Sequence, residues 1–233
     1  MIYDINARFG IGPGDRLLTL APCCSERKIY DVFGTLAAGA AVVALLDHPQ
    51  SLAALHETMH ETAVTVCSFL PSQAVEYCAF LEQTAASPPP ALRAMLLSGA
   101  PIDDELMSMT RRLLPHVEVA GLFGSAETSI WSMVQPLNAV EGRLKMWSLG
   151  RPMANQTALI LNEVGELCPP FARGELYIGG EGVAAGYLGD EEKTRTRFIR
   201  RPPLNGRFYR TCRQAMYLED GTIVQWPEVP TIG

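Results

Sequence analysis

Hydrophobic positions in the first two thirds of the chain alternate between short apolar runs and stretches with helical spacing. The apolar runs predict strands at residues 17–21, 40–46, 63–69, 92–97 and 117–122, of which 40–46 is expected to be buried. Apolar residues three or four apart predict helices at residues 2–9, 29–38, 52–62, 71–86 and 103–114. One face of the helix predicted at residues 29–38 carries its apolar side chains, Ile29, Val32, Phe33 and Leu36. Because strands alternate with helices, the pattern predicts β-α-β units and a parallel sheet.

The pattern changes near Gly150-Arg151-Pro152. Beyond this point short alternating segments occur at residues 158–161, 174–178 and 221–224, separated by glycine, proline and Asp-Gly turns. We therefore predict an α/β part at residues 1–149 and a small β-rich part, a barrel or a sheet, at residues 150–233.

Composition and charge narrow the class of protein. With 48% hydrophobic and 19% charged residues, the chain can bury a sizeable core. Its net charge of -6 gives no overall basic footprint, so we do not expect nucleic acid as a partner. The longest nearly apolar run, Val32 to Leu46, contains glycines and is too short to span a bilayer. No secretory signal is visible in the sequence, and we expect neither a membrane partner nor export.

Cysteine and histidine spacing does not favour a metal centre. The six cysteines contain no Cys-x-x-Cys pair, which favours buried thiols in a reducing cytoplasm over a disulfide framework. His56 and His60 lie four apart on a predicted helix and could share one face. Without a third ligand, solvated histidines are a better interpretation of this pair than a zinc site.

A glycine- and hydroxyl-rich stretch follows the strand predicted at residues 117–122. It reads Ala120-Gly121-Leu122-Phe123-Gly124-Ser125-Ala126-Glu127-Thr128-Ser129-Ile130-Trp131. Glycines let a backbone turn tightly and approach a bound group, and Glu127 could hold a divalent cation through oxygen. On spacing alone, a strand-to-loop turn with one solvated glutamate is the simpler interpretation.

Several motifs along nearly the whole chain occur in an order that matches one enzyme family. They are Gly14-Asp15-Arg16-Leu17-Leu18, Tyr30-Asp31-Val32-Phe33-Gly34, Leu97-Ser98-Gly99, Gly124-Ser125-Ala126-Glu127, Gly174-Glu175-Leu176-Tyr177-Ile178-Gly179-Gly180, Gly186-Tyr187-Leu188, Tyr209-Arg210-Thr211 and Asp220-Gly221-Thr222-Ile223. In this order they resemble the adenylation domains of nonribosomal peptide synthetases, within the adenylate-forming, AMP-binding enzymes. The resemblance implies a partial adenylate-forming N-terminal core, with a parallel-sheet α/β subdomain followed by a small β-rich, barrel-like subdomain.

The resemblance also implies a nucleotide site that uses ATP and magnesium. Glu127 would contact the magnesium carried with ATP, and Phe123 would replace the tyrosine that stacks on adenine. Ser125 and Ala126 would lie beside the phosphates, although Ala126 lacks the hydroxyl that the family usually places there. The implied nucleotide-binding positions are Gly99, Phe123, Gly124, Ser125, Ala126 and Arg213.

A second implied site is an amino-acid pocket. Its pattern is similar to that of cysteine-activating domains that feed heterocyclising, siderophore-type modules, in six positions: Tyr30, Leu96, Ser98, Leu122, Ile130 and Trp131. The alternative interpretation of these residues is ordinary core.

Departures from the family pattern affect both sites. Glu26 stands where the family has the aspartate that pairs with the substrate ammonium, next to Arg27 in place of an apolar residue, and Ser68 replaces an asparagine. The Arg27 guanidinium could pair with Glu26 and repel an ammonium. The family's Thr-Gly-Asp reads Thr211-Cys212-Arg213, and Arg213 has five donors but no acceptor for the two ribose hydroxyls.

By the same resemblance, the chain begins after the family's phosphate loop and ends before the hinge, the mobile C-terminal subdomain and the catalytic lysine. We therefore expect a truncated, inactive adenylation domain that is retained as a structural element. Its partners would be the other domains of a synthetase, such as condensation or cyclisation domains and a carrier protein. The alternative is a segment of an active, cysteine-like adenylating enzyme that forms aminoacyl-AMP from ATP once its other parts are supplied.

Overall fold

The computed structural model describes residues 1–45, 51–137, 147–200 and 206–226, which divide into two compact units. The α/β unit contains residues 2–122 together with Pro136 and Leu137, and the β-rich unit contains residues 123–135 and 147–226 of the described chain. This division places residues 123–135 with the β-rich unit, whereas the sequence-based boundary at 149/150 stays a prediction.

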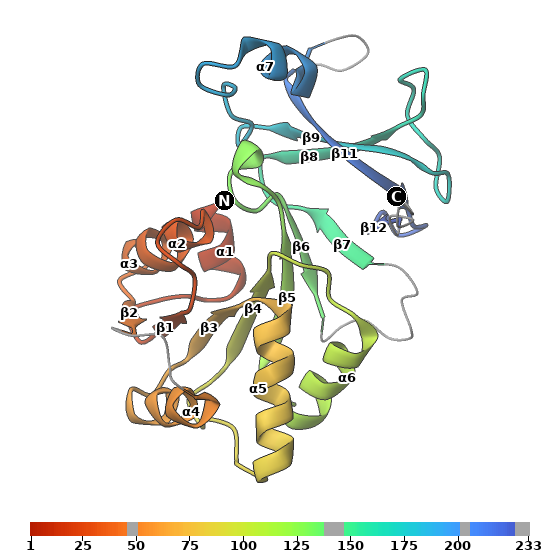
Figure 1. Cartoon of the computed structure of the whole chain (residues 1–233). Helices are drawn as coiled ribbons and strands as arrows, with labels where there is room; N and C mark the ends of the chain where they lie inside the picture. Colours follow the sequence, from red (N-terminus) through yellow and green to blue (C-terminus); the bar gives the residue numbers. More distant parts are fainter. Residues whose placement is uncertain (46–50, 138–146, 201–205, 227–233) are drawn as a thin grey trace. The chain divides into compact units, whose positions relative to one another are not determined.

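The α/β unit is built on a parallel sheet (Figure 1). Its strands lie in the order β2 (Ala41–Ala44), β1 (Arg16–Thr19), β3 (Val66–Phe69), β4 (Ala94–Ser98) and β5 (Glu118–Phe123). The connecting helices are α4 (Leu52–Glu61), α5 (Pro71–Thr84) and α6 (Asp104–Leu113), and α1 (Ile2–Arg8) precedes the first strand. This arrangement confirms the predicted α/β fold class.

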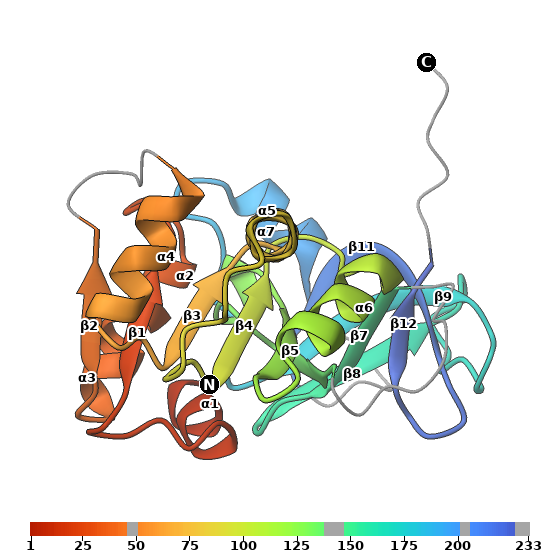
Figure 2. The same ribbon diagram turned by 90° about the horizontal axis from the view of Figure 1, so that it is seen from below.

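Helices cover both faces of this sheet, as Figure 2 shows. Helices α4, α5 and α6 lie on one face, and α1 and α3 (Thr35–Ala37) lie on the other. The chain moves from β1 to β2 in one direction and from β3 to β5 in the opposite direction. Because parallel crossovers are right-handed, opposite directions along the sheet place the connecting helices on opposite faces.

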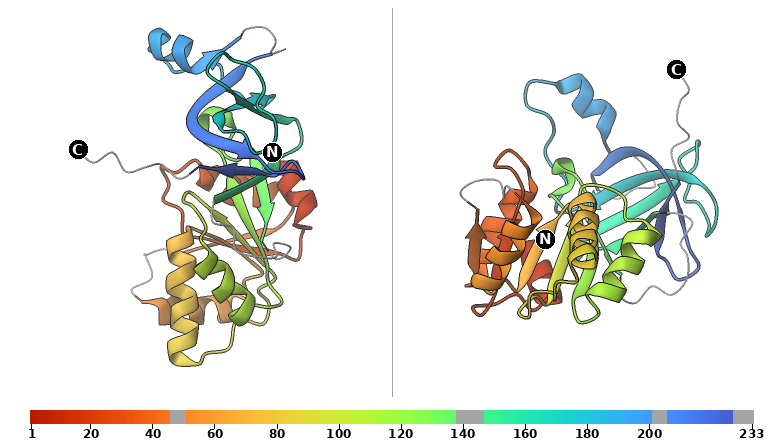
Figure 3. Two further views of the ribbon diagram at one scale, coloured as in Figure 1. Left: turned by 90° about the vertical axis from the view of Figure 1, so that its right-hand side faces the viewer. Right: turned by 60° about the horizontal axis from the view of Figure 1, so that its bottom comes forward.

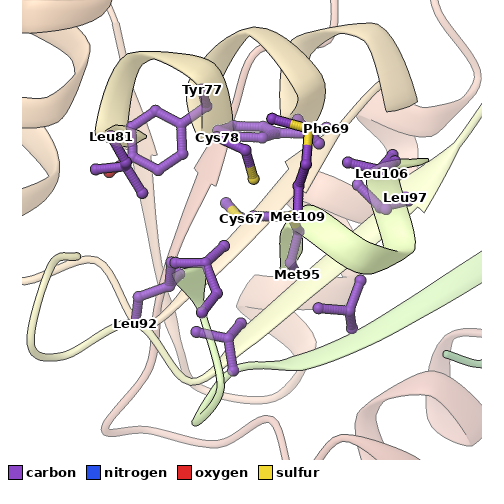
Figure 4. Close-up of a cluster of buried hydrophobic side chains, with 14 of the residues drawn as sticks. Cys67, Phe69, Tyr77, Cys78, Leu81, Leu92, Met95, Leu97, Leu106 and Met109 are labelled. Carbon is purple, nitrogen blue, oxygen red and sulfur yellow. The ribbon is translucent and has the colours of Figure 1, made fainter. Parts of the chain in front are cut away.

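The strand register separates an apolar face from a more polar one. Leu18, Cys67, Met95 and Val119 lie side by side across β1, β3, β4 and β5, and all are buried in the cluster beneath α5 and α6 (Figure 4). One position further along, the opposite face carries Thr19, Ser68, Leu96 and Ala120. Side chains alternate along a strand, so this second face is the one that the predicted pocket residues share.

Two elements of this unit differ from their prediction. The helix predicted at residues 29–38 consists of α2 (Arg27–Ile29), a π-helical turn (Tyr30–Gly34) and α3, and its predicted apolar face is exposed: Ile29 is 50%, Phe33 64% and Leu36 55% exposed. The side chains that it buries are Tyr30, Asp31 and Thr35. Strand β2, predicted as a buried strand, is the outermost strand and its residues are partly or fully exposed.

The β-rich unit contains an antiparallel sheet, visible in Figure 3. Its order is β6 (Met133–Pro136), β7 (Trp147–Pro152), β12 (Ile223–Gln225), β11 (Phe208–Tyr217), β9 (Gly174–Gly180) and β8 (Gln156–Leu161), with β10 (Phe198–Ile199) on β11. Within the described residues the sheet is open, so this unit is a sheet and not a closed barrel. Asp190 caps the N-terminus of helix α7 (Glu191–Arg197), because its side chain accepts a hydrogen bond from the Lys193 amide over 2.9 Å.

Strands β8, β9 and β12 occur where alternation predicted them, but β6, β7, β11 and α7 did not follow from the pattern. No helix in the described part of the chain is long and apolar enough to cross a membrane.

Candidate functional site

The loop that follows β5 is closed by its own backbone. Gly124 has no room for a side chain, because a Cβ there would collide with the carbonyl oxygen of Ile130. The Ser132 amide donates to the Phe123 carbonyl over 2.8 Å, and the Ser132 hydroxyl donates to the Thr128 carbonyl over 3.0 Å. These contacts fix a single turn, Ala126–Thr128, that presents Glu127.

Two consecutive residues in this loop have left-handed backbones. Ser129 has φ of 69° and Ile130 has φ of 62°, a region that β-branched residues strongly avoid. Such conformations cost on the order of 1–3 kcal/mol each and persist only when their surroundings impose them. Burial of Ile130 and Trp131, 7% and 2% exposed, provides that constraint. The stretch is therefore a strained loop and not a relaxed surface turn.

Glu127 is held by tyrosines from later in the chain. The Tyr187 hydroxyl donates to Oε1 of Glu127 over 2.6 Å, and the Tyr209 hydroxyl lies 3.4 Å from that of Tyr187. Burial tends to raise the pKa of the Glu127 carboxyl, but the donors Tyr187, Ser125 and Tyr209 outweigh it, so its pKa lies below the ordinary value. Glu127 is therefore an ionised, oriented carboxylate at neutral pH.

Arg213 lies over the ring of Phe123. Its guanidinium carbon is 4.9 Å from the ring centroid, within the distance at which a cation is attracted to an aromatic face. Its Nη1 donates to Oε1 of Gln225 over 3.0 Å, and Gln225 is 2% exposed. A buried acceptor and an aromatic ring therefore hold the guanidinium in place.

The neighbouring residue explains how Arg213 reaches this position. Strand β11 shifts its register against β9 between Arg210 and Gln214. Cys212 lies in this irregularity with φ of 59°, a conformation that glycine adopts at much lower cost. The Thr211 hydroxyl donates to the Leu176 carbonyl over 2.7 Å and accepts from the Arg213 amide over 3.1 Å.

In the α/β unit, predicted pocket residues share the polar sheet face. Ser68 pairs with Leu96, Ser98 lies two residues beyond Leu96, and Ser98 pairs with Leu122. All four are buried. The hydroxyl oxygen of Ser98 is buried without a hydrogen-bond partner in the described structure, whereas the buried Ser68 hydroxyl lies close enough to Asp31 to lower the pKa of its carboxyl. Buried hydroxyls without partners are costly, which is typical of a surface made for a ligand or for water.

Glu26 and Arg27 point to different environments. Glu26 is exposed, whereas Arg27 is 6% exposed, and no ion pair joins them within the described residues. The predicted pairing of these two side chains is therefore not seen. Nη1 of Arg27 is buried without a hydrogen-bond partner in the described structure. Glu26, which the resemblance predicts as the partner of the substrate ammonium, is thus exposed to solvent, and the cationic Arg27 is buried beside it in the sequence.

Two further predicted residues have a structural explanation. The Tyr30 hydroxyl donates to Oδ1 of Asn6 over 2.9 Å, which connects the π-helical turn to α1. Gly99 has φ of 94°, and a Cβ there would lie 2.8 Å from Cδ2 of Leu70. A glycine is thus required at the end of β4 for backbone reasons alone.

Sequence reasoning overlooked a buried carboxylate next to the pocket residues. Asp31 is fully buried and accepts a hydrogen bond from the Thr19 hydroxyl over 2.6 Å. Burial raises the pKa of Asp31, and the hydroxyls of Thr19 and Ser68 together with the charges of Arg27 and Lys28 only partly oppose this. Its presence in the motif Tyr30-Asp31-Val32-Phe33-Gly34 was the available signal. Tyr187 and Tyr209, which hold Glu127, were likewise present in quoted motifs but received no role.

The cysteines are divided between buried and exposed positions. Three cysteines are buried as expected (Cys67, Cys78 and Cys168), but three are exposed (Cys23, Cys24 and Cys212), and all six are free. Nδ1 of His56 lies 2.9 Å from the Tyr77 hydroxyl, and the rings of His56 and His60 are 4.5 Å apart. The described residues contain no cluster of three metal-ligating side chains.

Comparison with known proteins places the chain in a family. The model of the family "AMP-binding enzyme" matches residues 1–188. The chain is 36% identical over 227 residues to bacitracin synthase 1 of Bacillus licheniformis, and 37% identical over 224 residues to pyochelin synthetase PchF of Pseudomonas aeruginosa. Each match covers 95% of this chain, but the chain spans only 4% and 12% of the lengths of these curated relatives.

Solved structures agree with the sequence relatives. The nonribosomal peptide synthetase FmoA3 superimposes with a TM-score of 0.91 at 32% identity, over 97% of this chain and 24% of that one. A form of the same protein with bound AMPPNP gives a TM-score of 0.90. The chain therefore belongs to the AMP-binding enzymes, as a segment of a nonribosomal peptide synthetase adenylation domain.

Proposed function

We propose that this segment is a degenerate adenylation core that does not form aminoacyl adenylates and that serves as a structural element of a synthetase. The observation that carries the proposal is the position of Arg213, over the ring of Phe123 and bonded to Gln225.

The nucleotide does not fit this arrangement. By family resemblance, the position of Arg213 holds an aspartate that accepts hydrogen bonds from both ribose hydroxyls, and the guanidinium has no acceptor. The same guanidinium lies against the ring that the resemblance assigns to adenine. A nucleotide would have to displace a cation–π contact worth about 0.5–2 kcal/mol and leave its ribose hydroxyls without that acceptor.

Magnesium fits better than the nucleotide. Glu127 is ionised and oriented, and magnesium in phosphate-transfer sites is held by one or two carboxylates together with substrate phosphates. Glu127 could supply one such oxygen. The other ligands would come from the phosphates of a nucleotide and from water.

The amino-acid side supports the same conclusion. A substrate ammonium requires an ionised carboxylate inside the pocket. Glu26 is exposed, the cationic Arg27 is buried, and burial raises the pKa of the one buried carboxylate beside them, Asp31, which favours its neutral form. Bringing an ammonium close to an unpaired guanidinium is unfavourable in a low-dielectric interior. A pocket of this composition does not suit cysteine, although Tyr30, Leu96, Ser98, Leu122, Ile130 and Trp131 keep the pattern of that subgroup.

A second candidate function is an active cysteine-like adenylating enzyme that this segment forms together with further parts, with ATP and magnesium as cofactors. The intact hydrogen bond from Tyr187 to Glu127 favours it, because a relic has no need to keep that carboxylate oriented.

In both cases we propose the condensation or cyclisation and carrier domains of a synthetase as partners. The six free cysteines favour a reducing compartment such as the cytoplasm.

A chimera tests the two functions. The matching segment of the pyochelin synthetase adenylation domain is replaced by this chain, and amino-acid-dependent ATP–pyrophosphate exchange is measured with each standard amino acid. We expect no exchange above background, while the unmodified domain gives a strong signal. Exchange at the rate of the unmodified domain, with cysteine or any other amino acid, would show that the segment is not a degenerate, inactive adenylation core.

A repaired chimera controls for folding. It carries Cys212→Gly and Arg213→Asp, which restore the ribose acceptor, and both chimeras are compared by circular dichroism and by ATP binding. We expect ATP binding to return in the repaired chimera only. Equal ATP binding in the two chimeras would show that Arg213 does not exclude the nucleotide.

A further inference from the structure

Positive charge is concentrated in one stretch of an otherwise acidic chain. Residues 193–200 and 206–213, here called the basic segment, contain seven of the 19 Lys and Arg residues and none of the 25 Asp and Glu residues. The segment includes the end of α7, β10 and the first part of β11, which lie together in the β-rich unit (Figure 1). The described cations of the segment are Lys193, Arg195, Arg197, Arg200, Arg207, Arg210 and Arg213.

Aromatic rings and carbonyl groups, more than carboxylates, contact these cations. Nζ of Lys193 lies 4.3 Å from the ring centroid of Tyr187, and the guanidinium of Arg207 lies 4.8 Å from that of Phe198. Arg195 and Arg200 are exposed and make no hydrogen bond or ion pair within the described residues. Cation–π contacts position a charge without neutralising it, so the surface of the basic segment keeps a positive electrostatic field.

One cation of the segment does pair with a carboxylate. Nε of Arg210 lies 2.8 Å from Oε1 of Glu175 and 3.0 Å from its Oε2. No other ion pair involves the segment within the described residues. Because Arg210 uses Nε alone for this pair, its two terminal amino groups remain available as donors.

A hollow of about 1080 Å³ adjoins the basic segment. Thr196, Ile199 and Arg210 contribute to its lining from the segment itself, and Arg173 contributes a second guanidinium. Arg173 donates through Nε to Gln214 over 3.1 Å, which again leaves its terminal amino groups available. The hollow thus has two guanidinium groups whose terminal donors are available to an anion.

The remaining walls of the hollow combine an apolar patch with polar side chains such as Asn162, Thr196 and Gln214. Leu161 and Val164 line it together with Ile199, and Val164 is 76% exposed. Glu163 also lines it and is the one carboxylate there besides the paired Glu175. Apolar walls combined with guanidinium donors suit an occupant that carries both apolar side chains and carboxylates.

We propose that this hollow and the basic segment form a docking surface for an acidic, partly apolar segment of a partner protein. Leucine-like side chains of the partner would cover Val164 and Ile199, and its carboxylates would reach the terminal amino groups of Arg173 and Arg210. Nucleic acid fits less well, because the chain as a whole has a net charge of -6 and would repel a long polyanion. The proposal does not depend on whether the segment adenylates an amino acid.

Probe peptides test the charge and the apolar part separately. The full chain is titrated into a fluorescent peptide of alternating Glu and Leu, a matched peptide of Lys and Leu, and a peptide of Glu alone, at low and high salt. We expect the Glu and Leu peptide to bind about tenfold more tightly than either other peptide, and salt to weaken it. Equal binding of the Lys and Leu peptide would overturn the proposal.

Variants locate the surface. Arg173→Glu and Val164→Asp should each weaken the Glu and Leu peptide about tenfold, because they reverse the charge or the polarity of a lining side chain. Arg112→Glu on α6 and Leu188→Asp serve as matched controls that are exposed outside the hollow. Unfolding midpoints confirm that each variant folds. Equal loss in the control variants would overturn the proposal.

Two further probes address other classes of macromolecule. A short oligothymidylate and vesicles that contain phosphatidylserine are titrated under the same conditions. We expect both to bind more weakly than the Glu and Leu peptide. Tighter binding of either probe would replace an acidic protein partner by nucleic acid or by a membrane.

Discussion

The hydroxyl of Tyr187 donates to Oε1 of Glu127 over 2.6 Å, which joins two motifs that are 60 residues apart in the sequence. The same hydroxyl lies 3.4 Å from that of Tyr209, so three separate segments of the β-rich unit meet at one carboxylate. A hydrogen bond to an ionised acceptor is stronger than a neutral one. The oriented state of Glu127 therefore depends on a residue that carries no charge itself.

Replacing Tyr187 by Phe should destabilise the chain and do so in a pH-dependent way. Loss of this charge-assisted hydrogen bond should lower the free energy of unfolding by about 1–2 kcal/mol at neutral pH. The pKa of Glu127 is lowered in the folded state, so its contribution is present above the ordinary glutamate pKa of 4.5 and is lost as the pH falls below that value. Urea unfolding at a series of pH values measures the difference.

The control for this prediction is Tyr3→Phe, because Tyr3 is 83% exposed. Its unfolding should match the wild type at every pH. A Tyr187→Phe penalty that stays constant down to acid pH would show that the hydroxyl supports the fold without acting on the Glu127 charge.

The sequence was informative wherever one physical rule decided the outcome. Alternating apolar runs and helical spacing sufficed for the parallel sheet, because buried parallel strands such as β3 and β4 are apolar at almost every position. The rule failed for residues 29–38, where Ile29, Phe33 and Leu36 have helical spacing but face outward. Periodicity identifies an apolar face, and it does not say whether this chain alone covers that face.

Long-range polar contacts were beyond sequence reasoning. Arg93 is one of 19 Lys and Arg residues and belongs to none of the quoted motifs, yet it forms two hydrogen bonds to Asp15, 78 residues away in the sequence. Likewise, the replacement of an aspartate by Arg213 was visible in the motif, but its position over Phe123 depends on the irregular register of β11. Which groups meet is set by the fold, and residue types alone do not determine it.

Asp15→Asn should be among the most destabilising single changes in the α/β unit. Asp15 is 7% exposed and accepts from Arg93, from the Thr65 hydroxyl over 2.7 Å and from the Gly12 amide over 2.9 Å. The Arg93 side chain is 38% exposed, so solvent screens part of the charge that loses its partner, and we expect a loss of about 1–3 kcal/mol in the free energy of unfolding at neutral pH. Chemical unfolding measures it.

The contribution of Asp15 to the free energy of unfolding should increase as the pH rises. Burial raises the pKa of Asp15, but hydrogen bonds from Arg93, Thr65 and Gly12 outweigh it, so the folded-state pKa lies below 3.8. The stabilisation is therefore present above pH 3.8 and disappears as the pH falls further.

Glu82→Gln is the control, because the Glu82–Arg112 pair is 47% and 58% exposed and should contribute less than about 1 kcal/mol. Equal losses for the two variants would contradict the assignment of Asp15 as a buried anchor.

Cys212→Gly should stabilise the chain. Cys212 has φ of 59°, and a non-glycine residue in the left-handed region costs about 1 kcal/mol. Glycine removes that cost but adds freedom to the unfolded chain, so we expect a net gain of about 0.5 kcal/mol in the free energy of unfolding.

Thr211→Gly, one residue earlier and without positive φ, should instead destabilise through the loss of its hydrogen bond to Leu176. A loss of stability in Cys212→Gly would show that the contact of its thiol with Arg197, at 2.6 Å, outweighs the strain.

Phe33→Glu should reduce self-association of the isolated chain. Ile29, Phe33 and Leu36 are each at least 50% exposed and lie along the continuous α2, π-helical and α3 segment. An exposed apolar face of this kind lowers its free energy by contact with another surface, and two copies of the chain provide one. Burial of a Phe side chain contributes about 1.5–3 kcal/mol, so its replacement by a charge should weaken association by about tenfold or more. Sedimentation velocity over a range of concentrations measures this, with Leu188→Glu as the control, because Leu188 is fully exposed and belongs to the other unit. A wild-type chain that stays monomeric at all concentrations, or an equal effect of Leu188→Glu, would contradict the assignment of this face as the associating surface.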